Sequence, residues 1–408
     1  METNSNTTRV GLWGRMRLLG QSSIAAATLL GLLLAATVSA QTIAPLYSKE
    51  VSGGTVSQVA IAQIQFGWLV TAVKNGSGDL EVIVWHDTGS TIVRTGSATA
   101  GAITFGLGVT AQIGPDPLLA TVVTAAFNSS FNLELISWQV TSSGTITRVG
   151  SATSIQGGTS VSINWLSLGE GCENPEDFCV ATVTNSSADL TMSVWDITFL
   201  SGAITLMSTT SAGAAGSAVI SQGLPGPMLG SAYFLTAANV SGNLEMTLWD
   251  SASGVVNSEF AGLPTGQLAI SNPAAVGDES YDYNVATAIS STGNLEITSW
   301  YVNVTPPIEY PLMQAGGTAG AASQVSIVWA PLQGGPFPVT AIRDGKGNLS
   351  VEVWHSTSPS ILKEYATYNS SLAIESVAIT AEFDAYHVVT ASRTSANALK
   401  INVWLWTP

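Results

Sequence analysis

A leucine followed five residues later by a tryptophan occurs seven times along this chain of 408 residues. The seven copies are Leu80/Trp85, Leu133/Trp138, Leu190/Trp195, Leu244/Trp249, Leu295/Trp300, Leu349/Trp354 and Leu399/Trp404. Successive tryptophans are 50 to 57 residues apart, and no helical pattern lies between them. A period of about fifty residues without helices is typical of a propeller, in which each repeat is one blade. The motif therefore predicts seven blades.

Each repeat divides into four short strands. Apolar and polar residues alternate, and Gly, Asn, Asp and Ser interrupt the alternation where turns are required. In the sixth repeat the expected strands are 324–329, 337–342, 349–354 and 361–365. The fold class is therefore all-β: a seven-bladed β-propeller of four-stranded antiparallel blades.

Two positions within the repeat have an expected packing role. The tryptophan that ends the third strand is expected to lie between neighbouring blades, where a large ring fills the widening gap. The second strand repeats Val-Thr-Ala, for example at Val70-Thr71-Ala72 and Val389-Thr390-Ala391. We interpret this small motif as tight packing near the hub.

The two ends of the repeat region predict how the ring closes. The last repeat ends at Pro408, after its third strand. Residues 42–51 have the pattern of a fourth strand, similar to the segment that follows Trp85. We expect 42–51 to be the outer strand of the last blade, which closes the ring and leaves no open edge. Residues 41–408 then form one propeller domain.

Residues 1–40 have the pattern of a signal peptide. Arg9, Arg15 and Arg17 form a basic region, residues 22–38 are small and apolar, and the segment ends in Val38-Ser39-Ala40, a small-residue cleavage signature. Cleavage there predicts a secreted protein, extracellular or periplasmic, without a membrane span. The alternative is an uncleaved anchor, for which an apolar run of about 17 residues is at the short limit.

The composition excludes one class of partner. Charged residues make up 10% of the chain, against about 25% in typical soluble proteins. The formal net charge is −15, and a field of that sign repels nucleic acid. We therefore expect no nucleic-acid partner, and we expect cations or basic partners to be favoured.

The only two cysteines, Cys172 and Cys179, lie in one acidic stretch. In an exported protein we expect them to form a disulfide that closes a short loop; the alternative is two unpaired thiols. A zinc site in this stretch is not expected, because two cysteines without a nearby histidine cannot complete a tetrahedral shell.

Two acidic insertions interrupt the repeat, both between a first and a second strand and therefore on one face. They contain the candidate calcium ligands Glu170, Glu173, Asp177, Asp278, Glu279 and Asp282. Clustered carboxylates in loops suit calcium, although neither stretch has the regular spacing of a known calcium loop. The alternatives are ordinary solvated loops or the acid pair of a glycoside hydrolase.

Trp165 and Trp329 end two inner strands at matching positions, after Ser162-Ile163-Asn164 and Ser326-Ile327-Val328. An indole beside polar side chains is a platform on which sugars stack, so both are candidate ligand-binding residues. The alternative is ordinary packing at the hub. The three histidines, His86, His355 and His387, have no evident catalytic partners in sequence, and we expect them on the surface or in loops.

The repeat resembles those of secreted seven-bladed propellers, including lectin-like ones, over nearly all of residues 41–408. It lacks the Gly-His and Trp-Asp pairs of WD repeats at the usual places, and it lacks the Ser-x-Asp-x-Gly-x-Thr-Trp spacing of sialidase aspartate boxes. The resemblance implies an architecture, and it carries over no catalytic or binding residue.

The repeat without a distinct catalytic constellation favours a non-enzymatic binding or adhesion module that recognises a glycan, a surface polymer or an extracellular protein. One alternative is an extracellular polysaccharide hydrolase or lyase that uses loop carboxylates. Another is a structural subunit of an extracellular assembly, which the low charge content favours. No cofactor is implied besides the candidate calcium.

Overall fold

The structure, a computed structural model, describes the part of the chain between Thr42 and Thr407, with internal gaps. The described ranges are 42–50, 55–113, 119–155, 157–166, 177–185, 189–199, 201–225, 232–251, 253–277, 280–288, 292–303, 311–332, 335–358, 361–382 and 387–407. Residues Thr42–Thr407 form one compact unit built from β-strands. No helix among the described residues has the length and apolar character needed to cross a membrane.

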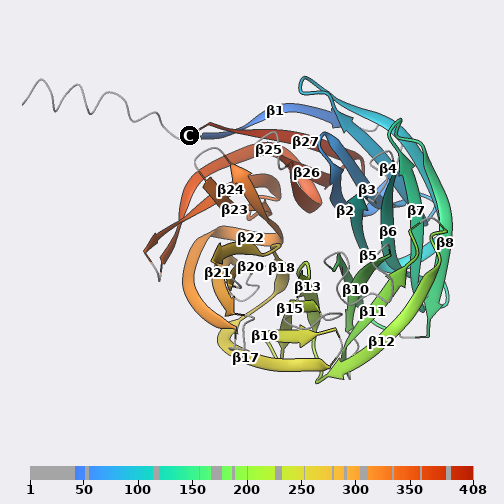
Figure 1. The fold of residues 1–408 in the computed structure, drawn as a ribbon. Coiled ribbons are helices and arrows are strands. Elements are labelled where there is room, and N and C mark those ends of the chain that lie inside the picture. Colours follow the sequence, from blue (N-terminus) through green and yellow to red (C-terminus); the bar gives the residue numbers. More distant parts are fainter. Residues whose placement is uncertain are drawn as a thin grey trace, which may run out of the picture. The chain divides into compact units, whose positions relative to one another are not determined.

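The strands form seven four-stranded antiparallel blades that follow one another around a ring (Figure 1). The strands of each blade are given from inner to outer. Blade 1 consists of β2 (Val56–Gln65), β3 (Trp68–Asn75), β4 (Asp79–Asp87) and the first part of β5 (Ile92–Ile113), and blade 2 of the second part of β5, β6 (Leu119–Asn128), β7 (Leu133–Thr141) and β8 (Ile146–Ser154). Blade 3 consists of β9 (Ser160–Trp165), β10 (Phe178–Asn185), β11 (Leu190–Ile197) and β12 (Ile204–Ala212), and blade 4 of β13 (Ser217–Ile220), β15 (Ala232–Val240), β16 (Asn243–Asp250) and β17 (Gly254–Pro264).

Blades 5 to 7 follow the same order. Blade 5 consists of β18 (Gln267–Ile270), β20 (Ser280–Ala288), β21 (Asn294–Asn303) and the first part of β22 (Leu312–Leu332). Blade 6 consists of the second part of β22, β23 (Gly335–Asp344), β24 (Asn348–Ser358) and the first part of β25 (Ile361–Glu382). Blade 7 consists of the second part of β25, β26 (His387–Thr394), β27 (Leu399–Thr407) and β1 (Thr42–Glu50). Two short strands, β14 (Leu224–Pro225) and β19 (Ala274–Gly277), pair with the second strands of blades 4 and 5.

The seven-bladed architecture expected from the sequence is confirmed. The inner strands contact one another in a closed cycle: β2 with β5, then β9, β13, β18, β22 and β25, and finally β25 with β2. Three strands are longer than expected, because β5, β22 and β25 each continue without a turn from the outer strand of one blade into the inner strand of the next. Neighbouring blades therefore share a backbone at these three places.

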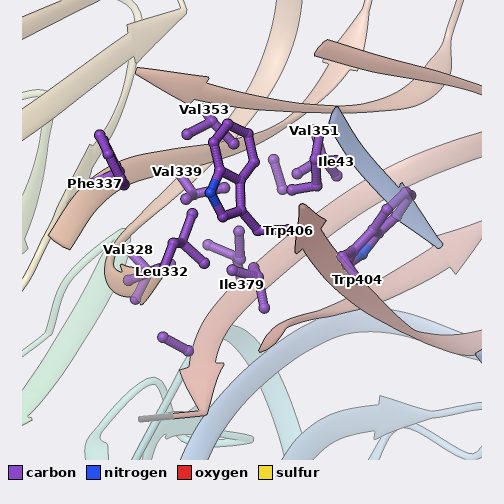
Figure 2. Packing of buried hydrophobic residues seen from close by; sticks show 14 of the residues in the cluster. Ile43, Val328, Leu332, Phe337, Val339, Val351, Val353, Ile379, Trp404 and Trp406 are labelled. Carbon is purple, nitrogen blue, oxygen red and sulfur yellow. The ribbon is translucent and has the colours of Figure 1, made fainter. Parts of the chain in front are cut away.

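The N-terminal strand closes the ring, as expected. β1 pairs antiparallel with β27, from Thr42 opposite Thr407 to Glu50 opposite Lys400. Ile43 on β1 is 3% exposed, and Figure 2 shows it in one cluster with Trp404 and with Val339 and Val351 of blade 6. The closing strand is thus held both by a backbone ladder and by burial of its own side chain.

The seven repeat tryptophans lie between blades. Each belongs to a different hydrophobic core of the described residues, and each core joins the tryptophan's own blade to the preceding one. Trp138 of blade 2, for example, packs with Val82 and Val84 of blade 1. Trp85 of blade 1 packs with Val389 and Ile401 of blade 7, so the seventh core closes the cycle.

Each indole N–H is satisfied by a buried threonine. In six blades it donates to the hydroxyl of a second-strand threonine: Trp85 to Thr71 (2.9 Å), Trp138 to Thr124 (3.0 Å), Trp195 to Thr182 (3.0 Å), Trp249 to Thr236 (2.8 Å), Trp354 to Thr340 (3.0 Å) and Trp404 to Thr390 (3.0 Å). The Val-Thr-Ala motif therefore supplies hydrogen-bond acceptors as well as close packing.

In blade 5 the indole N–H has a different acceptor. Val285 occupies the ladder position that holds threonine in the other blades, opposite Thr298. Trp300 donates to Thr298 of its own strand at 2.9 Å. A threonine two residues before the tryptophan thus replaces the missing partner across the ladder, because a buried N–H without an acceptor is costly.

Replacing Thr71 tests this interaction. Thr71→Val keeps the shape and leaves the N–H of Trp85 without an acceptor, because the residue two positions before Trp85 is Ile83, so we expect the free energy of unfolding in urea to fall by about 1–3 kcal/mol. Thr71→Ser keeps a hydroxyl and serves as the control. Equal stability of the two variants would contradict the role of the hydroxyl.

Closure by β1 is tested by a pair of substitutions on that strand. Ile43→Ala removes a buried side chain and is expected to cost about 2–5 kcal/mol of unfolding free energy. Leu46→Ala on the same strand removes a side chain that is 42% exposed, and we expect a change within about 0.5 kcal/mol. Similar effects of both changes would show that β1 does not pack on the ring in solution.

Candidate functional site

The inner strands surround a central opening of about 590 Å³ to which all seven blades contribute. One β-branched residue of each inner strand lies at the same ladder position, opposite the second-strand threonine or Val285. These seven residues are Ile61, Val109, Ile163, Ile220, Ile270, Ile327 and Ile379, and all line the opening. They form an apolar collar that repeats with the blades.

Amide and hydroxyl side chains line the opening next to this collar. They are Gln63, Gln65, Thr110, Gln112, Ser162, Asn164, Gln222, Asn272, Ser326 and Thr380. The amide of Asn164 in blade 3 donates to Asn272 of blade 5 at 3.1 Å, which links two blades that are not adjacent. Every described residue that lines the opening is uncharged.

The free backbone edges of the inner strands are partly capped by neighbouring blades. Ser162 accepts the backbone N–H of Ile220 at 3.3 Å, and Ser326 accepts that of Ile379 at 3.3 Å. An inner strand pairs on one side only, so its other edge needs such partners or a ligand. This explains why Ser162 and Ser326 occur at matching positions.

The structure separates the two predicted ligand-binding tryptophans. Trp165 lines the central opening and packs against the core between blades 2 and 3. Trp329 is also partly buried, at the corresponding place in β22, but it is not among the residues that line the opening. A role in ligand binding stays a prediction for both residues.

The predicted calcium ligands fall largely outside the described residues, which exclude Glu170, Glu173, Asp278 and Glu279 as well as the side chain of Asp282. Asp177 is described: it is buried, and its Oδ1 accepts the backbone N–H of Phe199 at 3.3 Å. That contact gives this carboxylate a structural task. The calcium site stays a prediction.

A cluster that the sequence did not reveal lies where blade 7 meets blade 1. It consists of Tyr47 on β1, Asp87 at the end of β4, Glu382 at the end of β25 and His387 at the start of β26. Asp87, Glu382 and His387 are 8%, 1% and 9% exposed. Nδ1 of His387 lies 3.7 Å from Oδ2 of Asp87 and 3.5 Å from Oε2 of Glu382. We call these residues the closure cluster.

One oxygen of Asp87 is fully engaged. Its Oδ1 accepts the phenol of Tyr47 and the backbone N–H of Gly89, the latter at 2.7 Å. In contrast, Oδ2 of Asp87, both carboxylate oxygens of Glu382 and Nδ1 of His387 are buried without a hydrogen-bond partner among the described residues. The closure cluster thus contains four buried polar atoms without conventional hydrogen bonds to the described part of the chain.

The pKa values of the closure cluster follow from burial and mutual charge. The neighbouring carboxylates, Asp87 first and then Glu382, raise the pKa of His387 to about 9. Burial raises the pKa of Glu382 and of Tyr47. Burial acts in the same upward direction on Asp87, but the neighbouring His387 and the hydrogen bond from Tyr47 outweigh it and hold the pKa of Asp87 below its usual value.

The expectation that the histidines lie on the surface or in loops is wrong for His387, which is buried in the closure cluster. His86 lies in β4 and stacks on Trp68 of β3, with ring centroids 4.4 Å apart. His355 is exposed on β24 and lies 5.2 Å from the ring of Tyr365. Asp87 and His387 are 300 residues apart in sequence, and only closure of the ring brings them together.

A second cavity, of about 560 Å³, lies along β24 in blade 6. Ser350 and Glu352 line it, and the Oγ of Ser350 and the Oε2 of Glu352 are buried without hydrogen-bond partners among the residues that the structure describes. Burial, with a smaller contribution from Glu364, raises the pKa of Glu352 to about 8. This carboxyl is therefore protonated at neutral pH and can donate a proton or a hydrogen bond.

The raised pKa of Glu352 makes stability depend on pH. Between its unfolded pKa, near 4.5, and about 8, the folded state holds a proton that the unfolded chain has released, so stability falls as pH rises through this window. Glu352→Gln is expected to reduce that fall by about 1–3 kcal/mol between pH 5 and 8, measured by urea unfolding. Glu375→Gln, at an exposed position of β25, is the control. The proposed pKa is wrong if both variants follow the wild-type pH profile.

Comparison with known proteins supplies no family. No protein-family model matches the chain, and no curated protein matches its sequence. Among solved structures, the fold is similar to the C-terminal WD40 domain of Sif2 (14% identity, 91% of this chain and 99% of that one, TM-score 0.47). It is also similar to Sqt1 of Saccharomyces cerevisiae (10%, 84% and 82%, 0.47) and to AofleA from Arthrobotrys oligospora (11%, 81% and 91%, 0.45). At these values the likeness concerns the fold, and no argument about function rests on it.

Proposed function

We propose that this protein is a binding module that takes an uncharged, hydroxyl-rich ligand, a glycan in the first place, in its central opening. The observation that carries the proposal is the lining: amide and hydroxyl groups from several blades converge there beside the indole of Trp165. Sugars present hydroxyl groups for such hydrogen bonds and C–H faces for an aromatic ring.

The dimensions of the opening support a small ligand or the end of a chain. Its volume of about 590 Å³ lies within the about 300–1,000 Å³ of ordinary ligand pockets. The collar supplies apolar contact, while Gln222 and Asn272 occupy the position that holds Trp165 in blade 3 and Trp329 in blade 6. One ring of positions thus combines stacking with hydrogen bonding.

The charge distribution supports a neutral ligand. The chain has a formal net charge of −15, yet the described lining of the opening has no charged side chain. A neutral ligand loses no Coulomb energy on approach, and it avoids the cost of burying an unpaired charge. An anionic polymer would be repelled by the rest of the surface.

The setting that we propose is extracellular or periplasmic. It rests on the signal-peptide pattern of residues 1–40 and on the cysteine pair. Cys179 is buried in β10, whereas Cys172 lies outside the described residues. A disulfide between them is part of the proposal, and mass spectrometry of a non-reducing digest of the secreted protein tests it.

Binding to a glycan array, followed by affinity measurement on the best hit, tests the proposed function. Trp165→Ala is expected to weaken binding about tenfold or more, because it removes the stacking surface. Trp329→Ala is the comparison variant: Trp329 occupies the same repeat position but is not among the residues that line the opening, so we expect a smaller loss of affinity than from Trp165→Ala. Thermal unfolding of both variants checks that they fold.

Three results would count against the proposal. Binding to no glycan would redirect the search to protein partners and to assembly. An unchanged affinity of Trp165→Ala would show that the opening is not the binding site. Cleavage of a bound polysaccharide would favour the hydrolase or lyase alternative, for which Glu352 is a carboxyl with a raised pKa that lines the second cavity.

A further inference from the structure

The closure cluster has the donor set of a metal site. One imidazole nitrogen of His387 and one carboxylate oxygen each of Asp87 and Glu382 lie within 4.8 Å of one another. Nitrogen together with carboxylate oxygen is a ligand set that zinc and neighbouring transition metals accept. Calcium and magnesium prefer all-oxygen shells with more ligands.

The distances within the closure cluster fit a shared ion better than direct hydrogen bonds. A charge-assisted N–H···O bond spans about 2.7–2.9 Å, whereas Nδ1 of His387 lies 3.7 Å from Asp87 and 3.5 Å from Glu382. Ligands about 2.0–2.1 Å from a tetrahedral zinc ion are separated by roughly 3.3–3.4 Å. The two separations between His387 and the carboxylates lie close to that edge length, and all three donor atoms lie within 4.8 Å of one another.

The unpartnered atoms give a second, independent reason. Glu382 is 1% exposed, and neither of its carboxylate oxygens has a hydrogen-bond partner in the part of the chain that the structure describes. Within the same described residues, Oδ2 of Asp87 and Nδ1 of His387 are buried and unpartnered as well. Burying such groups without compensation costs several kcal/mol, and a metal ion between them would satisfy all three residues at once.

The surroundings of Asp87 orient it as a ligand. Tyr47 and the backbone of Gly89 both donate to Oδ1, which leaves Oδ2 directed towards His387. Hydrogen bonds to the non-ligating oxygen are the usual way in which a second shell fixes a carboxylate ligand. They also connect the site to β1, the strand that closes the ring.

We propose that Asp87, Glu382 and His387 bind a divalent transition-metal ion, Zn²⁺ in the first place, which joins blade 7 to blade 1. The ion fastens the ring at its closure: Asp87 belongs to blade 1, Glu382 and His387 belong to blade 7, and Tyr47 adds β1 through the carboxylate of Asp87. None of the three ligands is among the described residues that line the central opening, and none is among the predicted calcium ligands.

The test is a Zn²⁺ titration of the chelator-treated protein by isothermal calorimetry, with metal content measured by mass spectrometry. We expect one saturable ion per chain and a thermal unfolding midpoint that rises with Zn²⁺ concentration. Glu382→Gln and His387→Gln are each expected to weaken binding at least about 100-fold, and Tyr47→Phe, in the second shell, about 10–100-fold.

His355→Gln is the matched control, because it removes an exposed histidine of blade 6 and should leave Zn²⁺ affinity unchanged. Absence of saturable Zn²⁺ binding to the wild-type protein would overturn the proposal whether or not the variants fold. Binding that survives both Glu382→Gln and His387→Gln would overturn it too, because the ion would then lie elsewhere. The glycan-binding result bears on neither outcome.

Discussion

The hydrogen bond between each buried indole and a buried threonine hydroxyl is the contact on which the ring depends. Burying a tryptophan between two blades removes a large apolar surface from water, but it also buries an N–H that needs an acceptor. The threonine hydroxyl meets that need from within the blade, so the indole is held in one orientation against the preceding blade. Seven such contacts set the spacing of seven blades, and the central opening is what remains between the inner strands.

This dependence explains why the sequence was so informative about the fold. Trp85, Trp138 and their counterparts occur at a fixed place in the repeat because each fills the same gap, so their spacing reports the number of blades. The hydrogen-bond role of the second-strand threonine does not follow from the sequence, because Val-Thr-Ala is equally a motif of small residues. In blade 5, Val285 replaces the second-strand threonine, and Thr298 accepts the indole N–H of Trp300 in its place. The indole therefore requires an acceptor, but the acceptor can occupy a different position in the blade.

The site could be predicted only where its residues share a repeat position. Trp165 was found because it interrupts a series of equivalent residues, yet Trp329 has the same sequence signal and does not line the opening. Sequence gives the position in the repeat, whereas access to the opening depends on how each inner strand packs against its neighbours. Asp87, Glu382 and His387 have no common position and lie in the first and last repeats, so no pattern along the chain joins them.

The closure cluster lies at the place where an ion that joins two blades has the largest effect on the stability of the ring. Six blades are built from consecutive strands, and blade 7 alone is assembled from both ends of the propeller, with β1 beside β27. Opening the ring therefore requires separation of β1 from β27 without breaking the chain. Tyr47 and Asp87 lie on the N-terminal side of that joint, while Glu382 and His387 lie on the C-terminal side. An ion held between the two sides would oppose the one separation that the covalent chain does not prevent, which gives a physical reason for burying two carboxylates at this seam.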